Sequence, residues 1–305
     1  MKNKILILLF TIFAHAYGEG GFVGSSYRYG SNARSIALSN STLANYNKSY
    51  NALTNPALLG DIKELEYGFS YFDMSLDRYI QTFSITIPAP PVASIALSTY
   101  ILGTNNIPGA SSGNVPTGSY SAWEGYGMLS FGTSMGNFSP GVNIKLFQNK
   151  IASYTADGVG LDIGFLYKLS PESQIALMFE NIYAKYSWDV NTGESELSYD
   201  EEFPQIISLG LSSKIKSKIL LLYQMDYNSE VNNYIHKTGI EWDSNKIYKL
   251  RLGLNNKNNV LNHSFGFGID IYKTKNNLNI GLDYAMDTGK FEEGTSHLFT
   301  FTFLK

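Results

Sequence analysis

The last ten residues of the chain, 296–305, alternate aromatic and polar side chains with a period of two. In the strand that this pattern predicts, Phe299, Phe301 and Phe303 fall on one face and the threonines between them fall on the other. A bare aromatic strand at the edge of an open sheet invites aggregation. In a closed barrel the last strand pairs with the first, so that no edge is left. The C-terminal stretch therefore favours a closed barrel.

The same alternation recurs along the chain from Lys63 onward. It predicts fourteen strands, near 63–76, 78–88, 91–103, 119–133, 140–149, 157–169, 172–184, 203–214, 217–227, 233–243, 247–255, 262–273, 276–286 and 296–304. An even number is usual for single-chain bacterial barrels, and most of these segments reach the ~9–11 residues that a membrane strand needs. The predicted fold class is all-β, a 14-stranded antiparallel transmembrane β-barrel over residues 63–305.

The connections between these strands differ in length in a regular way. The longest gaps, 104–118, 185–202 and 287–295, all follow odd-numbered strands, whereas most connections after even-numbered strands are short turns. A soluble β-sandwich has no reason to follow such a rule, but outer-membrane barrels combine long extracellular loops with short periplasmic turns. We therefore expect outer-membrane lipid around the barrel and both termini in the periplasm. Prolines 88, 90 and 91 predict weakened pairing, and hence a wall gap, at the base of the third strand.

The N-terminus carries the features of an export signal. Lys2 and Lys4 precede a short apolar run, and Ala14-His15-Ala16 fits a cleavage site, so residues 1–16 are predicted to be a signal peptide. No later segment is long and apolar enough for a transmembrane helix. The protein is therefore expected to be exported.

Residues 17–62 differ from the rest of the chain, because they are rich in Ser, Asn and Gly and only weakly periodic. One or two helical turns are predicted within 33–43, and Asn55-Pro56-Ala57 predicts a turn or helix start, where proline's missing N–H costs least. Two interpretations remain open, a disordered leader and a small folded plug in front of the barrel. We predict the plug, because several apolar side chains of this segment can be buried.

The polar faces of the predicted strands carry glycines and charges, and we assign these faces to the lumen. Seven charged residues are expected there: Asp226, Lys237, Glu241, Lys249, Arg251, Asp270 and Asp283. Unpaired charges are costly away from water, so these groups should be paired or hydrated. They form either an ion-pair network that fixes the strand register or a polar track for a solute. The inward glycines leave room at the wall, which the segment 17–62 is expected to fill.

Composition excludes several other functions. Charged residues make up 16% of the chain, against ~25% in ordinary soluble domains. The chain has no cysteine, so a thiolate metal site and a cysteine nucleophile are excluded. The sequence has no basic patch of the kind that would predict nucleic-acid binding. The three histidines after the signal peptide, at 236, 263 and 297, fall on apolar faces, and no motif of a serine hydrolase or zinc protease is present. We predict no catalysis and no cofactor, and an outer-membrane hydrolase stays as the alternative of another class.

Several pieces of the sequence resemble FadL-like and PorV/PorQ-like outer-membrane proteins. The stretch 31–39 resembles the start of the mature family members, and 55–57 is similar to the N-P-A that precedes their first strand. The later pieces 180–182, 226–227, 239–242 and 250–253 resemble the family's strand-end patterns in the same order. The plug motif that this resemblance implies comprises Ala33, Arg34, Asn55, Pro56 and Ala57.

The resemblance implies a fourteen-stranded barrel with a periplasmic N-terminal plug and one of two activities. FadL-like members pass hydrophobic small molecules, such as long-chain fatty-acid-like solutes, across the outer membrane. PorV-like members work with the type IX secretion machinery and bind cargo protein. The leading hypothesis is the channel, with a hydrophobic solute as its partner, and the alternative is the secretion component.

Overall fold

The computed structural model describes residues 22–152, 154–191, 196–230, 232–244, 247–257, 260–271, 278–287 and 295–305. The expected signal peptide lies outside these residues. The described chain begins with short helical turns: η1 (Ser25–Tyr29), α1 (Ala33–Ala37), η2 (Lys48–Tyr50), α2 (Asn51–Thr54) and η3 (Pro56–Asp61). No helix in the described part is long and apolar enough to span a membrane.

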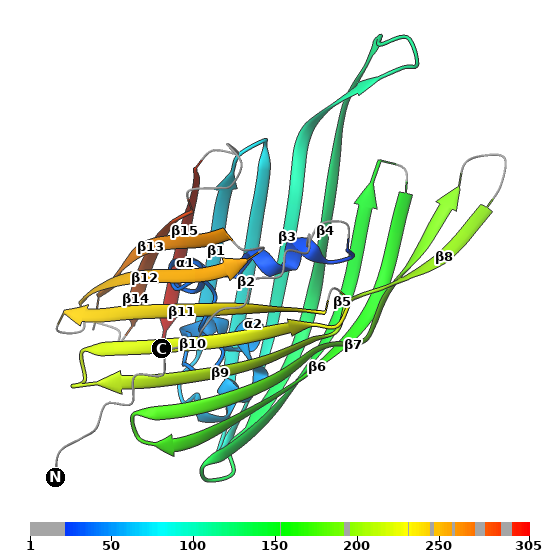
Figure 1. The fold of residues 1–305 in the computed structure, drawn as a ribbon. Helices are drawn as coiled ribbons and strands as arrows, with labels where there is room; N and C mark the ends of the chain where they lie inside the picture. The colour runs from blue at the N-terminus through cyan, green and yellow to red at the C-terminus, as the bar shows by residue number, and fades with distance from the viewer. Residues whose placement is uncertain are drawn as a thin grey trace.

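The rest of the described chain is almost entirely β-structure (Figure 1). The strands are β1 (Glu66–Met74), β2 (Arg78–Ala89), β3 (Ala93–Ala110), β4 (Pro116–Thr133), β5 (Phe138–Ile151), β6 (Tyr154–Ser170), β7 (Ser173–Asn191), β8 (Glu196–Glu202), β9 (Ile206–Ile215), β10 (Ile219–Asn228), β11 (Asn233–Ser244), β12 (Tyr248–Lys257), β13 (Val260–Ile271), β14 (Asn279–Asp287) and β15 (Ser296–Leu304).

The last strand closes a ring with the first. β15 pairs antiparallel with β1, which places Phe301 opposite Phe69 and Phe299 opposite Tyr71. The ring then runs through β1 to β7 and returns from β9 to β15, and β7 pairs directly with β9. The described wall is therefore a closed antiparallel barrel of fourteen strands, as the alternation predicted.

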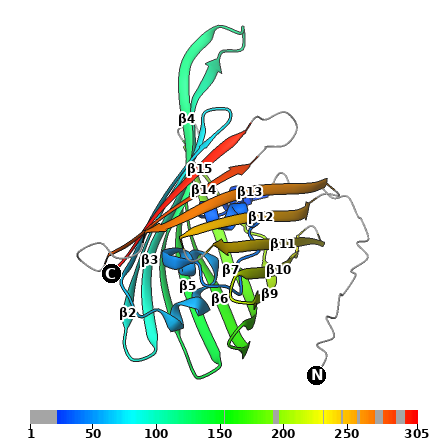
Figure 2. The ribbon, with the colours of Figure 1, turned by 90° about the vertical axis from the view of Figure 1, so that its left-hand side faces the viewer.

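The long connections differ from the prediction, because two of the expected loops are built largely of paired strands. β3 and β4 continue together to Ala110 and Pro116, and the expected loop 185–202 contains the outer part of β7 and the additional strand β8. Among the described strands, β8 pairs only with this outer part of β7 and does not enter the ring. Both hairpins extend beyond the barrel, upward for β3/β4 and sideways for β7/β8 (Figures 1 and 2). Pairing gives their backbone groups partners that an irregular loop would lack.

The strands present the faces that the sequence predicted. On β15, Phe299 and Phe301 are 43% and 42% exposed on the outside, whereas Thr300 and Thr302 are each 1% exposed on the inside. Apolar side chains of the other strands continue this exposed outer surface, as expected for a barrel that spans a membrane. On β10, Leu220 and Leu222 face inward, and they pack with Leu38 of the N-terminal segment.

The predicted wall gap at the base of the third strand is wrong. The register of β2 against β3 runs without a shift from Arg78, opposite Thr104, to Ala89, opposite Ala93. The prolines do not interrupt it, because β1 begins at Glu66, opposite Thr86, so that Pro88 lies beyond β1, and the other two prolines lie between β2 and β3. The wall is instead irregular at β7.

Strand β7 contains two register shifts against β6, between Val159 and Ile163 of the latter. Asn181 and Tyr183 of β7 have φ angles of 61° and 55°, which residues other than glycine adopt uncommonly. Each of these register shifts adds one extra residue to β7 relative to β6. Such extra residues form β-bulges, which bend the strand and redirect its side chains. The bulges end the pairing of β7 with β9 after Glu180.

Candidate functional site

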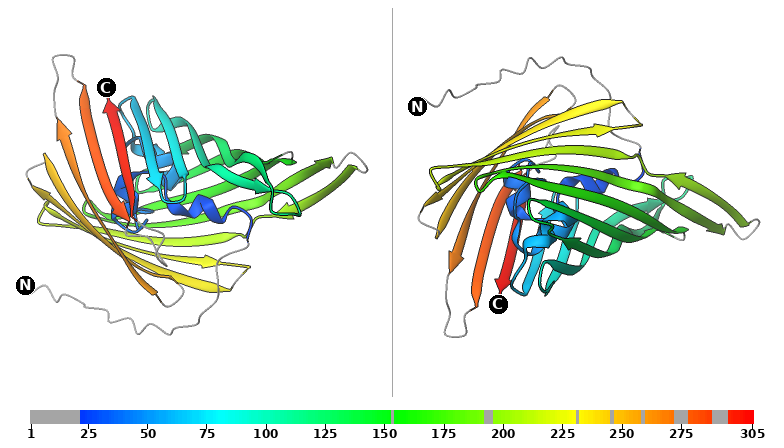
Figure 3. Two further views of the ribbon diagram at one scale, coloured as in Figure 1. Left: turned by 90° about the horizontal axis from the view of Figure 1, so that it is seen from above. Right: turned by 90° about the horizontal axis from the view of Figure 1, so that it is seen from below.

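The described part of the N-terminal segment, residues 22–62, lies inside the ring of strands (Figure 3). Helix α1 lies against β12–β15, and η3 lies against β3–β6. Nine inward glycines make this possible, because a Cβ built on them would collide with the segment: Gly68, Gly132, Gly141, Gly164, Gly210, Gly239, Gly253, Gly266 and Gly281. The segment therefore fills the room that these glycines leave at the wall.

The residues of the expected plug motif organise the two ends of this segment. Asn55 caps η3, where its Oδ1 accepts a hydrogen bond from the backbone N–H of Ala57 at 3.0 Å, and Pro56 occupies the first position. The Nδ2 of Asn55 also donates to the carbonyl oxygen of Leu43 at 3.2 Å. At the other end, the N–H of Ala33 donates to Thr300 of the closing strand at 2.8 Å. Both ends are thus tied locally and to the wall.

Arg34 projects from α1 into a chain of buried ion pairs. Its guanidinium donates to both carboxylate oxygens of Glu241 on β11, at 2.9 and 3.3 Å. Arg251 of β12 donates to the same carboxylate at 2.7 Å and to Asp283 of β14 at 2.6 Å. These four side chains are at most 9% exposed. Charges that are buried this deeply are tolerated when they are paired and hydrogen-bonded.

Lys48 extends the chain from the N-terminal segment. Its Nζ lies 2.6 Å from Asp270 Oδ1 and 3.5 Å from Asp283 Oδ2. Lys249 reaches the other oxygen of Asp270 at 2.6 Å. Five of the seven expected lumen charges therefore belong to one network, and two cations from the N-terminal segment complete it. Lys48 was missed because its stretch has no periodicity that predicts its direction.

The remaining two expected charges, Asp226 and Lys237, form a separate pair at 2.5 Å. A second pair, Lys145 with Asp162 at 2.8 Å, was not predicted as part of the site. Inward alternation on β5 and β6 is a signal for it, because the neighbours of Lys145 along its strand are apolar and face outward. Glu180, next to the bulge of β7, and Arg28 of η1 are two further charges of the lining that were not predicted.

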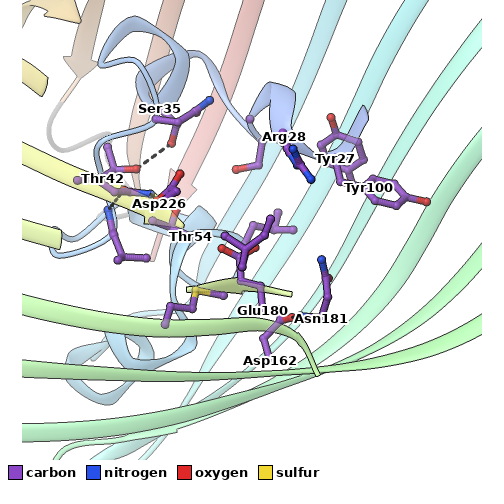
Figure 4. Close-up of a pocket in the computed structure, with 18 of the residues that line it drawn as sticks. Tyr27, Arg28, Ser35, Thr42, Thr54, Tyr100, Asp162, Glu180, Asn181 and Asp226 are labelled. Carbon is purple, nitrogen blue, oxygen red and sulfur yellow. Dashed lines mark hydrogen bonds between the residues drawn. The ribbon is translucent and has the colours of Figure 1, made fainter. Parts of the chain in front are cut away.

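A cavity of about 210 Å³ separates these two pairs from the N-terminal segment (Figure 4). Its lining combines the charged pairs and Glu180 with aromatic and sulfur-containing side chains, among them Tyr100, Tyr126, Met128 and Met178. The volume is below the ~300–1,000 Å³ of pockets for drug-sized ligands. The cavity is therefore suited to a small solute that has both polar and apolar parts.

Aromatic rings cover one side of this cavity. Tyr27 of η1 packs edge-on against Tyr100 and Tyr126, with ring centroids 5.5 and 5.1 Å away. Its hydroxyl shares a hydrogen bond of 2.7 Å with that of Tyr186. Burial holds the pKa of Tyr27 well above its usual range, so its phenol stays neutral. Beyond it, Phe147 and Phe203 stack at 4.5 Å.

The outer face carries the histidines. His236 and His297 each share a hydrogen bond with a tyrosine, Tyr223 at 2.8 Å and Tyr284 at 2.9 Å. His263 lies beside Phe265, with ring centroids 5.7 Å apart. Among the described residues no group of three or more His, Cys, Asp or Glu side chains is arranged to hold a metal ion. What the described lumen offers is a binding cavity, buried ion pairs and an aromatic wall.

Comparison with known proteins identifies the fold. No protein-family model matches the sequence, and no curated protein matches it. Among solved structures, the toluene transporter TodX of P. putida superposes with a TM-score of 0.67 at 12% identity, over 90% of this chain and 98% of that chain. A FadL homologue of Pseudomonas aeruginosa gives 0.63 at 10% identity, over 90% and 98%. CymD, a monoaromatic hydrocarbon channel, gives 0.56 at 11% identity, over 93% and 98%. The FadL-like fold implied by the resemblance is thus confirmed.

Proposed function

We propose that this protein is an outer-membrane channel for hydrophobic small molecules, in which residues 17–62 form the plug. The observation that carries the proposal is the combination of a complete fourteen-strand barrel and an N-terminal segment packed into its lumen. At least 90% of the chain superposes on proteins described as a toluene transporter, a monoaromatic hydrocarbon channel and a FadL homologue. The proposal involves no catalysis and no cofactor.

The proposed orientation places the two long hairpins outside the cell and both termini in the periplasm, after removal of the signal peptide at 1–16. A solute would enter at the hairpin end and reach the cavity beside the aromatic rings. It would leave along the lumen or sideways through the wall. The bulges of β7 support a sideways route at this point, because Glu180 and Asn181 line the cavity and belong to the irregular part of the wall.

The solute is proposed to be small rather than a long-chain fatty acid. The cavity is limited in volume, and six of its lining side chains are charged. An alkyl chain buried there would desolvate charged groups without offering them partners, which costs free energy. A compact molecule with one polar group avoids this cost.

The second candidate function is a PorV-like component of type IX secretion that binds cargo protein. One feature favours it, the dense ion-pair network that occupies the lumen beside β11–β14. A binding partner at the exposed hairpins would need no open lumen. Co-purification of secretion-machinery proteins with the full-length chain, together with absence of solute uptake, would favour this function over the channel.

The channel is tested with vesicles whose outer leaflet contains lipopolysaccharide, which slows the entry of hydrocarbons. Vesicles that contain the full-length protein are expected to take up toluene faster than empty vesicles. A variant that lacks residues 22–62 should increase uptake further and add ion conductance. Mass spectrometry of the purified protein and of Pro56→Ala should reveal co-purified hydrophobic molecules. Uptake equal to that of empty vesicles, without any bound molecule in either form, would refute the channel.

A further inference from the structure

Glu180 stands at the point where β7 leaves its neighbour. Its last partner on β9 is Ile206, and the following residue, Asn181, has the positive φ of the bulge. Glu180 and Met178 lie two positions apart on β7, and both line the cavity. The alternation of β7 thus places the carboxylate of Glu180 at the wall of the cavity, directly before the bulge (Figure 4).

The two aspartates beside Glu180 are fully engaged. Asp162 accepts hydrogen bonds from Lys145, from Asn143 at 3.1 Å and from the backbone N–H of Asn181 at 3.0 Å. On the other side of the cavity, Asp226 accepts from Lys237 at 2.5 Å and from Gln224 at 2.8 Å. Each lysine near the cavity thus already has its own aspartate.

The carboxylate of Glu180 differs from these aspartates. Among the residues that the structure describes, no hydrogen bond or ion pair reaches it. Removing a carboxylate from bulk water without a hydrogen-bond donor is unfavourable, and a donor that arrives with a ligand lowers this cost, because buried polar groups need partners. The structure therefore presents an acceptor in the cavity that a bound molecule can satisfy.

The surroundings of this acceptor define the rest of the ligand. Tyr100, Tyr126, Met128 and Ile235 line the same cavity and offer apolar and aromatic surface. Aromatic faces attract organic cations as well as apolar groups. A hydrocarbon alone would leave Glu180 without a donor, whereas an ammonium group with a short apolar body satisfies both parts of the site.

The formal charges that line the cavity sum to zero, so the position of Glu180, and not the total charge, decides which ligand charge fits. Three carboxylates line it, those of Asp162, Glu180 and Asp226, and two of them are neutralised by lysines of the wall. Arg28 adds a further cation from the N-terminal segment, so an anionic ligand is the alternative to a cationic one. Glu180 would repel an anion, and the anionic probe hexanoate tests this alternative.

We propose that the lumen cavity binds a small amphipathic amine, whose ammonium group donates to Glu180 and whose apolar part lies against the tyrosine and methionine side chains. The inference rests on the proposed function, because it names the class of solute that the channel would carry. It adds a polar requirement that none of the compared proteins' descriptions contains.

Calorimetric titration of the full-length protein in detergent micelles tests the site with three probes of equal length, hexylamine, hexanol and hexanoate. Hexylamine is expected to bind most tightly at neutral pH. Glu180→Gln should weaken its binding about tenfold or more, because a charge-assisted hydrogen bond is lost. Glu180→Asp should retain part of the affinity, and it shows whether the charge or the shape of the side chain matters.

Glu172→Gln is the matched control, because Glu172 is an exposed carboxylate in the turn before β7. It should bind hexylamine as the original chain does. Heat-modifiable migration on gels verifies that each variant forms a folded barrel, and if Glu180→Gln fails this check, the weakened binding expected for Glu180→Asp decides. Tighter binding of hexanoate, or unchanged hexylamine binding in Glu180→Gln, would overturn the inference.

The vesicle assay separates this inference from the channel itself. If toluene enters the vesicles but hexylamine does not bind, the amine site is wrong and the channel stands. If hexylamine binds through Glu180 but no solute enters the vesicles, the channel is wrong and the site stands.

Discussion

Replacing Arg34 with methionine should release the N-terminal segment from the lumen. The side chain of Arg34 makes five hydrogen bonds, two to Glu241 and three to oxygen atoms of the segment itself, at Asn45, Tyr46 and Asn47. Methionine keeps an unbranched side chain of similar length but removes every donor. Among the described residues, Glu241 would then keep only Arg251 as a cation within hydrogen-bonding distance.

The expected magnitude follows from burial. The side chains of Arg34 and Glu241 are 7% and 9% exposed, and breaking a buried pair costs about 3–5 kcal/mol. The strand ladders of the barrel do not depend on this contact, so the cost should fall on docking of the segment. At about 1.4 kcal/mol per factor of ten, the undocked population should rise by about two to four orders of magnitude.

Two measurements follow the segment directly. Limited proteolysis of the protein in vesicles should cut Arg34→Met within residues 22–62 much faster than the original chain, and single-channel recordings should show added conductance. Lys168→Met is the matched control. Lys168 also links the wall to the segment, through Asp61 at 2.5 Å, but the two side chains are 29% and 45% exposed. An exposed ion pair contributes about 0–1 kcal/mol to stability, so Lys168→Met should change the proteolysis rate and the conductance little.

A double-mutant cycle with Glu241→Gln decides whether the pair acts as a unit. Coupled residues should give an interaction free energy well above the ~0.3–0.5 kcal/mol within which independent sites add. Additive effects of Arg34→Met and Glu241→Gln, together with unchanged proteolysis, would refute the idea that this ion pair holds the segment.

Two further predictions concern the wall. Gly141→Ala should weaken docking of the segment by about 1–3 kcal/mol, because its new Cβ collides with the backbone of Pro56. Gly127→Ala should leave docking unchanged, because open space surrounds this position. Limited proteolysis of the segment compares the two variants. Phe301→Arg should destabilise the barrel by about 2–4 kcal/mol if this residue lies near the bilayer midplane, because it faces lipid. Urea unfolding in lipid vesicles measures this effect, Phe301→Leu is its control, and equal stability of the two variants would place this face away from lipid.

The period of two along the strands was enough to predict most of the barrel. Side-chain direction in a strand alternates with each residue, so the outward position of Phe301 and the inward position of Asp270 can be predicted from neighbours alone. The same local rule placed the predicted charges in the lumen. The longest connections follow odd-numbered strands, which predicted that they lie at one end of the barrel. Connection length alone could not show that two of them consist of paired strands.

The contacts that build the candidate site depend on tertiary structure. The resemblance singled out Arg34, but nothing local shows that it meets Glu241, 207 positions away. The N-terminal segment has no dominant periodicity, so Lys48 had no predicted direction. The bulge at Asn181 interrupts the alternation on which every prediction for the wall rests, and it ends the pairing of β7 with β9 directly after Glu180, which lines the cavity. Local chemistry thus determined the strand faces of this protein, whereas its ion pairs and cavity arise only when distant segments meet inside the closed ring.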